Sequence, residues 1–341
     1  MTTTQTSVVH DLGTLAHRLS HPARTPCVCE PPQVLADRPD GTVVRSGAIV
    51  AKAHAADTDR AALTARIALA AAPQLAGVLL PPLTAPEPAA PTARPVTLWP
   101  LGAPVDPTDP GAAPWAEAAD LLARLHRTEP PFPLPPMRGP AKAARAVARM
   151  RAALRGDAIT PPRDPAVEPG DATAPPRDPA VLSVLAGWRA LPAWARGEAP
   201  APAPRADALC HGDLHLGQLV RHPAPDGPWL LIDMDDAGVG DPAWDLGRPA
   251  AWYAAGLLAP EDWSTFLDAY RAAGGPAVPA DGDPWPALDV PARALTVQTA
   301  AVALTKCAAE QRDPDDHEQL MIESCARIAT LPPELATGPA S

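Results

Sequence analysis

The chain has 341 residues, of which 49 are proline and 22 are glycine, and it carries a formal net charge of −11. This much proline and glycine approaches the composition of disordered chains, but hydrophobic residues make up 46% of the sequence, so we expect a folded core interrupted by proline-rich connectors. The negative charge argues against unspecific binding of nucleic acid, which requires an excess of lysine and arginine.

The N-terminal residues, the apolar pattern and the cysteines of the chain indicate a cytoplasmic protein. Residues 1–7 are polar and lack the charged and then apolar pattern of a signal peptide. No stretch approaches the roughly 18 uninterrupted apolar residues of a membrane span. The five cysteines are thinly spread, which fits a reducing compartment, and Cys27 and Cys29 have no matching Cys or His pair for a zinc site. The oligomeric state does not follow from the sequence.

Proline-free stretches locate the folded elements of the N-terminal part. The two strands with the most β-branched residues are separated by Ser46-Gly47, which is a two-residue hairpin signal. The patterns predict a helix around Val8–Leu19, strands at 41–45 and 48–53, an alanine-rich helix at about 57–72, and strands at 77–80 and 95–99.

The rest of the chain reads as mostly helical, with one hairpin inside it. Its patterns predict helices at 115–126, 141–154, 244–258, 261–273, 290–312 and 315–330. The basic residues of the helix at 141–154, Lys142 among them, are interpreted as a solvated face in preference to a phosphate-binding patch. An exact repeat, PPRDPAV at 161–167 and 175–181, marks a duplicated low-complexity insertion at about 156–180.

The fold class expected from this order is α+β, with a small strand-rich part before a larger helical part. We expect an N-terminal helix and tail at 1–29, a strand-rich lobe at 30–102 and a mainly helical lobe at 103–341.

The residues most informative about chemistry lie between 209 and 245. Asp213 follows a His-Gly pair, so a tight turn is expected to hold its carboxylate beside a groove, and the short loop returns the chain at Gln218. An apolar strand at 229–232 ends at Asp233, and a hairpin between the two strands would put Gln218 and Asp233 side by side. Phosphoryl transfer requires a carboxylate that accepts a hydroxyl proton and oxygen ligands that hold Mg²⁺. A single Asp in such a loop is more often a turn or cap residue, but two matching loops favour the chemical interpretation.

Lys52 is the third candidate. Lysine occurs at only three positions among the 28 basic residues of the chain, so a lysine within an apolar strand indicates a need for a compact ammonium group. Its expected role is to bind nucleotide phosphates. Alone this signal is weak, because a lysine on an edge strand is ordinary.

Taken in order, these motifs resemble the aminoglycoside phosphotransferase and choline-kinase-like superfamily over roughly residues 30–330. The resemblance rests on Lys52, LLARLH at 121–126, HGDLHLGQ at 211–218, LIDMDD at 231–236 and GDPAWDL at 240–246. The second motif ends in Gln in place of the usual Asn, and in this form it also resembles the motif of the maltokinase branch. The resemblance implies a bilobal protein-kinase-like fold, ATP and Mg²⁺ as cofactors, and a small-molecule hydroxyl as acceptor.

Roles follow from the resemblance residue by residue. Asp213 is the implied catalytic base, and His211 and Asp245 are implied to support its loop. Gln218 and Asp233 are the implied metal ligands, and Lys52 anchors the phosphates. The remaining positions carry lesser roles: Trp99 and Leu101 at the adenine-contacting hinge, and Asp241 as the N-cap of a helix that begins at Pro242.

Two departures keep an alternative open. The helix after Lys52 contains no Glu, so the usual partner carboxylate of the lysine is missing, and only residues 38–41 mark a turn where a glycine-rich loop would lie. A non-catalytic or partner-dependent kinase-like subunit of a modifying or regulatory complex is therefore the second hypothesis. Acidic residues near the C terminus, including Glu310, Asp315 and Glu318, are compatible with a pocket for a cationic acceptor, but we favour a solvated helix connector.

Overall fold

The computed structural model describes residues 3–21, 30–38, 41–83, 94–154, 178–202 and 207–332. Contacts between Cα atoms divide the chain into two compact units. The first comprises Met1–Pro135 and Leu216–Asp235, and the second comprises Pro136–His215 and Asp236–Ser341. The chain therefore passes between the units at residues 215–216 and again at 235–236.

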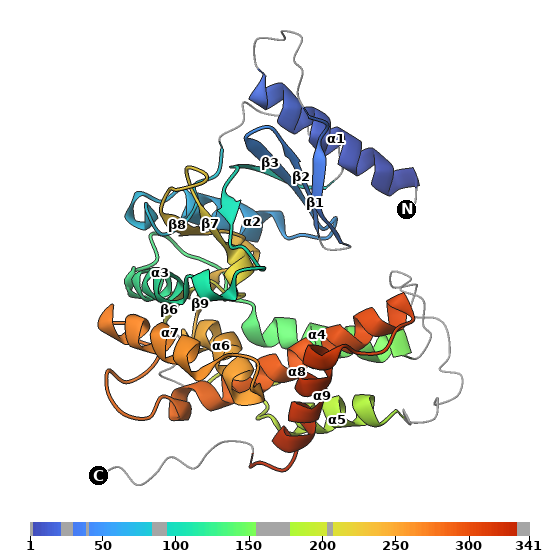
Figure 1. Cartoon of the computed structure of the whole chain (residues 1–341), viewed down its shortest axis with the longest axis vertical. Helices are drawn as coiled ribbons and strands as arrows, with labels where there is room; N and C mark the ends of the chain where they lie inside the picture. The colour runs from blue at the N-terminus through green and yellow to red at the C-terminus, as the bar shows by residue number, and fades with distance from the viewer. Residues whose placement is uncertain are drawn as a thin grey trace. The chain divides into compact units, whose positions relative to one another are not determined.

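A four-stranded antiparallel sheet in the order β1-β2-β3-β4 lies in the first unit (Figure 1). Leu12 and Ala16 of a long N-terminal helix share a buried cluster with Val44 and Ala51 of the sheet. Because side chains alternate along a strand, the residue after Ala51, Lys52, lies on the opposite face. The elements concerned are α1 (Thr3–Ser20), β1 (Gln33–Arg38), β2 (Gly41–Ser46), β3 (Ile49–His54) and β4 (Val96–Pro100).

The predicted helix and hairpin of this unit are confirmed, with shifts of a few residues. Ser46 still pairs with Ile49, so the two turn residues are Gly47 and Ala48, not Ser46 and Gly47. Gly47 has φ 57°, a conformation that glycine adopts without steric cost. Helix α2 (Arg60–Ala70) is shorter than predicted because the Asp59 side chain accepts hydrogen bonds from two N–H groups of its first turn.

The strand predicted at 77–80 is wrong. A 3-10 turn, η1 (Pro73–Leu75), precedes this segment, and Gly77 has φ 74°, which interrupts an extended chain. Leu79 makes one isolated bridge with Leu231, and the Leu80 N–H donates to the Leu231 carbonyl. The apolar residues of this segment are buried, but the segment is an irregular connection between elements. A hydrophobic run in the sequence cannot by itself distinguish such a connection from a strand.

A second sheet of the first unit carries the hairpin expected around Gln218 and Asp233. Its strands are β5 (Ala103–Pro104), β7 (Leu219–Arg221) and β8 (Trp229–Leu231), in the order β5-β7-β8. The first unit also contains α3 (Trp115–Arg127), which was expected in the helical lobe and contacts β8. The first unit thus extends beyond residue 102, where the sequence predicts the end of the strand-rich lobe. It does so because β5 pairs with β7.

The second unit is built on helices around α8, which contacts α4, α6 and α9 and has most of its residues buried. A short antiparallel pair, β6 (Ala208–Cys210) and β9 (Gly238–Gly240), lies beside them. The predicted helices are confirmed as α4 (Gly139–Leu154), α6 (Ala243–Ala255), α7 (Pro260–Ala272), α8 (Trp285–Glu310) and α9 (Asp316–Ile328), and α5 (Pro179–Ala190) is added. Most of the duplicated insertion, residues 155–177, lies outside the described residues.

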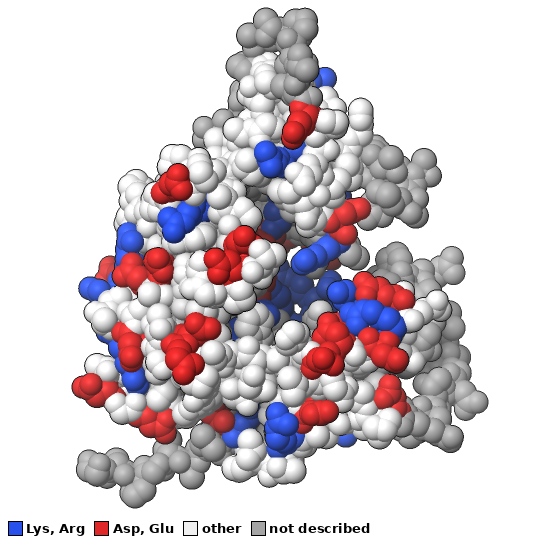
Figure 2. Space-filling model, in the orientation of Figure 1, with Lys and Arg blue, Asp and Glu red and all other residues white. Residues whose placement is uncertain are grey.

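Two properties of the described residues bear on partners. None of the described helices has both the length and the apolar character needed to cross a membrane. On the face drawn in Figure 2, the described lysine and arginine side chains lie interspersed with aspartate and glutamate. This differs from the broad basic stripe of a nucleic-acid-binding surface.

Candidate active site

In the first unit, Lys52 lies between two carboxylates. Its Nζ is 2.6 Å from Asp233 Oδ1 and 3.0 Å from Asp235 Oδ2. Burial alone would lower the pKa of Lys52, but the two carboxylates more than offset this effect and raise the pKa above its usual value. Lys52 is therefore a fixed positive charge, which suits the binding of a nucleotide phosphate. One cluster of contacts joins Lys52, Asp233, Asp235 and His54.

Gln218 and Asp233 meet at the end of the β7–β8 hairpin. The Ile232 N–H donates to the Gln218 carbonyl at 2.9 Å, which extends the hairpin by one step, and Gln218 Nε2 lies 3.4 Å from Asp233 Oδ2. Asp233 has φ 61°, a strained conformation for a residue with a side chain and one that often marks a functional position.

These two residues fit a magnesium ion. A carboxylate and an amide supply oxygen donors, which Mg²⁺ prefers, and rotation of the Gln218 amide by half a turn presents its oxygen to the Asp233 side. In the structure the ammonium of Lys52 occupies the cation position at Asp233 Oδ1. Of the two donors, Asp233 therefore already contacts a positive charge, while the Gln218 amide lies at the other oxygen of that carboxylate.

Trp99 and Leu101 lie on the β4 side of the same unit. Trp99 packs against a buried cluster formed by Leu80, Val220 and Leu230. The Leu101 N–H donates to the Ala48 carbonyl at 2.8 Å, and the Leu101 carbonyl lies 3.1 Å from His222 Nδ1. The N–H and the carbonyl of Leu101 therefore both bind partners within the protein. This differs from the expectation that a hinge residue offers these groups to adenine.

In the second unit, Asp213 is held between two cations. Its Oδ2 is 2.5 Å from Lys142 Nζ, and its Oδ1 is 2.6 Å from an Arg248 nitrogen. Burial raises the pKa of Asp213, but Lys142 and Arg248 outweigh burial and the pKa lies below its ordinary value. Lys142 also contacts Asp236 at 2.7 Å. Asp213 is thus an ionised carboxylate at neutral pH, as a proton acceptor must be.

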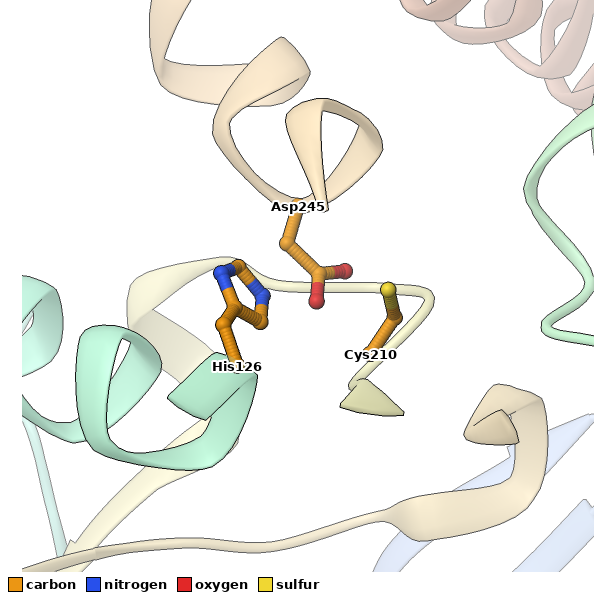
Figure 3. Close-up of side chains that lie close together, drawn as sticks. All are labelled: His126, Cys210 and Asp245. Atoms are coloured by element: carbon orange, nitrogen blue, oxygen red, sulfur yellow. The ribbon is translucent and has the colours of Figure 1, made fainter. Parts of the chain in front are cut away.

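Asp245 braces the loop that carries Asp213. Its carboxylate accepts hydrogen bonds from the His211 N–H at 2.6 Å and the Gly212 N–H at 2.7 Å. Gly212 has φ 84°, and a side chain there would collide with the Asp236 backbone, so glycine is required. Figure 3 shows the Asp245 carboxylate beside Cys210, whose thiol lies within 4.8 Å of it.

The other residues around this loop have supporting positions. The Asp213 N–H donates to His211 Nδ1 at 3.3 Å, and His211 is fully buried. Asp241 accepts from the Ala243 N–H at 3.0 Å and so serves the first turn of α6, but the N-cap position falls at Pro242, one residue after the predicted N-cap Asp241. Burial and the nearby Arg248 lower the pKa of His215 to about 4, so this histidine is neutral at pH 7.

Sequence reasoning missed several members of these clusters. Lys142 was assigned to a solvated face, whereas it binds Asp213 and Asp236. Its rarity was the available signal, because the argument used for Lys52 applies equally to the lysine at 142. Arg248 carried no such signal, since arginine is the ordinary cation of this chain. Asp235 and His54 stood beside recognised residues but had no assigned partner until the strands were placed.

The class of protein follows from comparison with known families. A model of the phosphotransferase enzyme family matches residues 41–288, which is most of the chain. The chain therefore belongs to this family. No curated protein matches it.

Solved structures give the same fold at low sequence identity. Over 95% of this chain and 98% of the other, it is similar to a thermostable mutant of aminoglycoside phosphotransferase APH(4)-Ia in a ternary complex with AMP-PNP and hygromycin B, with a TM-score of 0.56 and 13% identity. Choline kinase from Cryptosporidium parvum gives a TM-score of 0.55 at 10% identity, with 90% of each chain covered. Choline kinase LicA from Streptococcus pneumoniae gives 0.53 at 13% identity, covering 94% of this chain and 99% of that one. The kinase-like α+β fold and the superfamily are confirmed, while the maltokinase-like likeness stays a prediction.

Proposed function

We propose that this protein is an ATP- and Mg²⁺-dependent phosphotransferase that acts on a hydroxyl group of a small molecule. The observation that carries the proposal is Asp233, whose carboxylate contacts both Lys52 and Gln218. Membership of a phosphotransferase family supports it, as do the contents of related structures: one aminoglycoside phosphotransferase holds AMP-PNP and hygromycin B, and spectinomycin phosphotransferase holds ADP and spectinomycin.

The residues of the chain have distinct tasks in the proposed reaction. Asp213 orients the acceptor hydroxyl and takes its proton, and its loop is braced by Asp245. Lys52 binds the phosphates, and Gln218 and Asp233 hold the metal. When bound, Mg²⁺ neutralises charge on the phosphoryl group being transferred. Such catalysis consists mainly of positioning and charge neutralisation.

The acceptor is proposed only as a hydroxylated small molecule, such as an aminoglycoside, a sugar or a related metabolite. The non-catalytic alternative drew support from the missing Glu partner of Lys52. That support weakens, because two aspartates contact the Lys52 ammonium within 3.0 Å.

Nucleotide binding by the purified chain discriminates between these alternatives. Calorimetry with ATP and Mg²⁺ should give binding that depends on the metal. Asp233→Asn should weaken it by about tenfold or more, because one charged ligand is lost. Asp213→Asn is the matched control: it makes the same change to a carboxylate of the second unit and should bind ATP with Mg²⁺ as wild type does. If the isolated chain bound no nucleotide, the non-catalytic alternative would be favoured.

A further inference from the structure

Helix α2, which follows the strand that carries Lys52, has no carboxylate that could contact this lysine. Helix α2 spans Arg60–Ala70 and contains no Asp or Glu. Asp59, at its start, is committed to the N–H groups of Ala61 and Ala62 at 2.9 and 3.1 Å. The ammonium instead contacts Asp233 and Asp235. Under the proposed function Asp233 is shared with the metal, which leaves Asp235 as the carboxylate dedicated to the lysine.

Asp235 is itself held by a histidine of the same strand as Lys52. His54 Nδ1 lies 3.0 Å from Asp235 Oδ2, and its side chain is only 2% exposed. Lys52 and His54 are two residues apart on β3, so their side chains leave the same face of the sheet. The Lys52 and His54 side chains therefore both reach the carboxylate of Asp235.

The other nitrogen of His54 continues the contacts into β4. His54 Nε2 lies 2.8 Å from Thr97 Oγ1, and Trp99 Nε1 donates to the same oxygen at 3.0 Å. An indole N–H is only a donor, so the Thr97 oxygen accepts from it and the hydroxyl hydrogen is free to point to His54 Nε2. A neutral imidazole that accepts at Nε2 must carry its hydrogen on Nδ1, and that hydrogen points to Asp235.

The donors and acceptors in this row can therefore all align in one direction, from Trp99 through Thr97 and His54 to Asp235. Hydrogen bonds aligned in this way polarise one another, and the last one, to a carboxylate, is the strongest. The contacts of the row hold the His54 ring in place and, through it, the Asp235 oxygen that Lys52 contacts.

We propose that Asp235, oriented by His54 and Thr97, is the positioning residue of Lys52 and takes the place of the missing helix carboxylate. The inference rests on the proposed function, since it assigns Lys52 to the nucleotide phosphates. It adds that the lysine is set by residues of β3, β4 and the segment after β8, with no contribution from α2. Asp235 and His54 touch neither metal nor phosphate in this role and act only through Lys52.

The test measures binding of a fluorescent ATP analogue with Mg²⁺ and, where an acceptor is known, the KM for ATP and kcat. Asp235→Asn and His54→Leu should each weaken nucleotide binding by about tenfold, since each removes a charge-assisted hydrogen bond. His54→Asn keeps an N–H near the position of Nδ1 and should restore most of the loss. Thr97→Val should give an intermediate loss, because His54 is then free to change tautomer. The KM for ATP should rise with little change in kcat.

The matched control is Thr64→Val, which removes the same hydroxyl from an exposed position on α2 and should bind nucleotide as wild type does. Thermal melting of each variant separates misfolding from a positioning defect, and Asp235, 35% exposed, tolerates substitution better than buried His54. If excess Mg²⁺ rescued Asp235→Asn, Asp235 would be a metal ligand and the inference would be wrong. Folded Asp235→Asn and His54→Leu proteins with wild-type affinity would also overturn it. If wild type bound no nucleotide, the proposed function itself would fail.

Discussion

Asp213 is a carboxylate whose basicity is set by its neighbours. Lys142 from α4 and Arg248 from α6 contact its two oxygens, one each, and together they outweigh the effect of burial on its pKa. A hydroxyl that binds to Asp213 must share or displace one of these contacts. Lys142 is the more mobile partner, since an ammonium on a flexible chain reorients more readily than a planar guanidinium.

Replacing Lys142 should therefore change how activity depends on pH. In Lys142→Met one cation is lost, so the pKa of Asp213 rises from its depressed value. A base with a raised pKa becomes protonated at a higher pH, so the acidic limb of the kcat/KM profile should move to higher pH. Arg151→Met, an exposed arginine of the same helix, should leave the profile unchanged. An acidic limb that did not move in Lys142→Met would show that Asp213 is not the titrating base.

The contacts of these residues explain what the sequence could and could not predict at this scale. Gln218 and Asp233 are joined by one short hairpin, so local reasoning brings them together. Lys142 and Arg248 reach Asp213 from separate helices, and Asp235 reaches His54 across 181 residues of sequence. Such pairs depend on how strands and helices pack, which the spacing of a single sequence does not contain.

At the scale of elements, the connection between α8 and α9 is held by one arginine and a helix cap. Arg312 contacts Glu318 at 2.6 Å and Glu310 at 2.8 Å. Asp315 and Glu318 form a capping box, each accepting from the backbone N–H of the other. These acidic residues are thus engaged in ending one helix and starting the next, which supports the helix connector over a pocket for a cationic acceptor.

Glu318→Gln should destabilise this connection. The hydrogen bonds with Arg312 lower the pKa of Glu318 to about 2. The carboxylate therefore contributes stability above its ordinary pKa, near 4.5, and the contribution is lost as pH falls toward about 2. At pH 7 the loss should be about 1 kcal/mol, mostly from the ion pair with Arg312, because the Gln amide oxygen can still accept the hydrogen bond from the Asp315 N–H.

A melting experiment on wild type and Glu318→Gln checks this. The expected fall in Tm is about 2–4 °C at pH 7 and should shrink as the pH is lowered below about 4. Glu323→Gln replaces an exposed glutamate of the same helix, whose carboxylate accepts a hydrogen bond from Gln319, and should change Tm by less than about 1 °C. If the two variants lowered Tm equally, Glu318 would contribute no more to stability than Glu323 does, and its assigned role in this connection would be wrong.

Elements were predicted best where periodicity is strong, even where a proline lies within the helix, as Pro249 does in α6 and Pro291 does in α8. The α1 helix, the β2–β3 hairpin and the helices from α6 to α9 fall where the patterns placed them. Strands β1 and β5 were missed because β1 is a largely exposed strand next to prolines and β5 has only two residues. The false strand at 77–80 shows the opposite error, in which burial alone imitates a strand.

At the scale of the whole molecule, the proline-rich composition describes the connectors. Prolines are absent from 40–72, 205–222 and 229–241, the three stretches that carry Lys52, Asp213 with Gln218, and Asp233. Two of these stretches include the points where the chain passes between the compact units, at 215–216 and 235–236. Asp213 therefore belongs to the second unit and Gln218 to the first, although only five residues separate them along the chain.

Phosphoryl transfer itself is the central claim, and the most direct measurement is the mass of the product from a screen of hydroxylated metabolites and antibiotics for ADP release. With wild type, ATP and Mg²⁺, we expect an accepted compound to gain one phosphoryl group for each ADP formed. Asp213→Asn should lower kcat by a factor on the order of 10²–10⁴, with nucleotide binding kept. Phosphorylated product formed by Asp213→Asn at the wild-type rate would contradict the assignment of the base and with it the proposed mechanism.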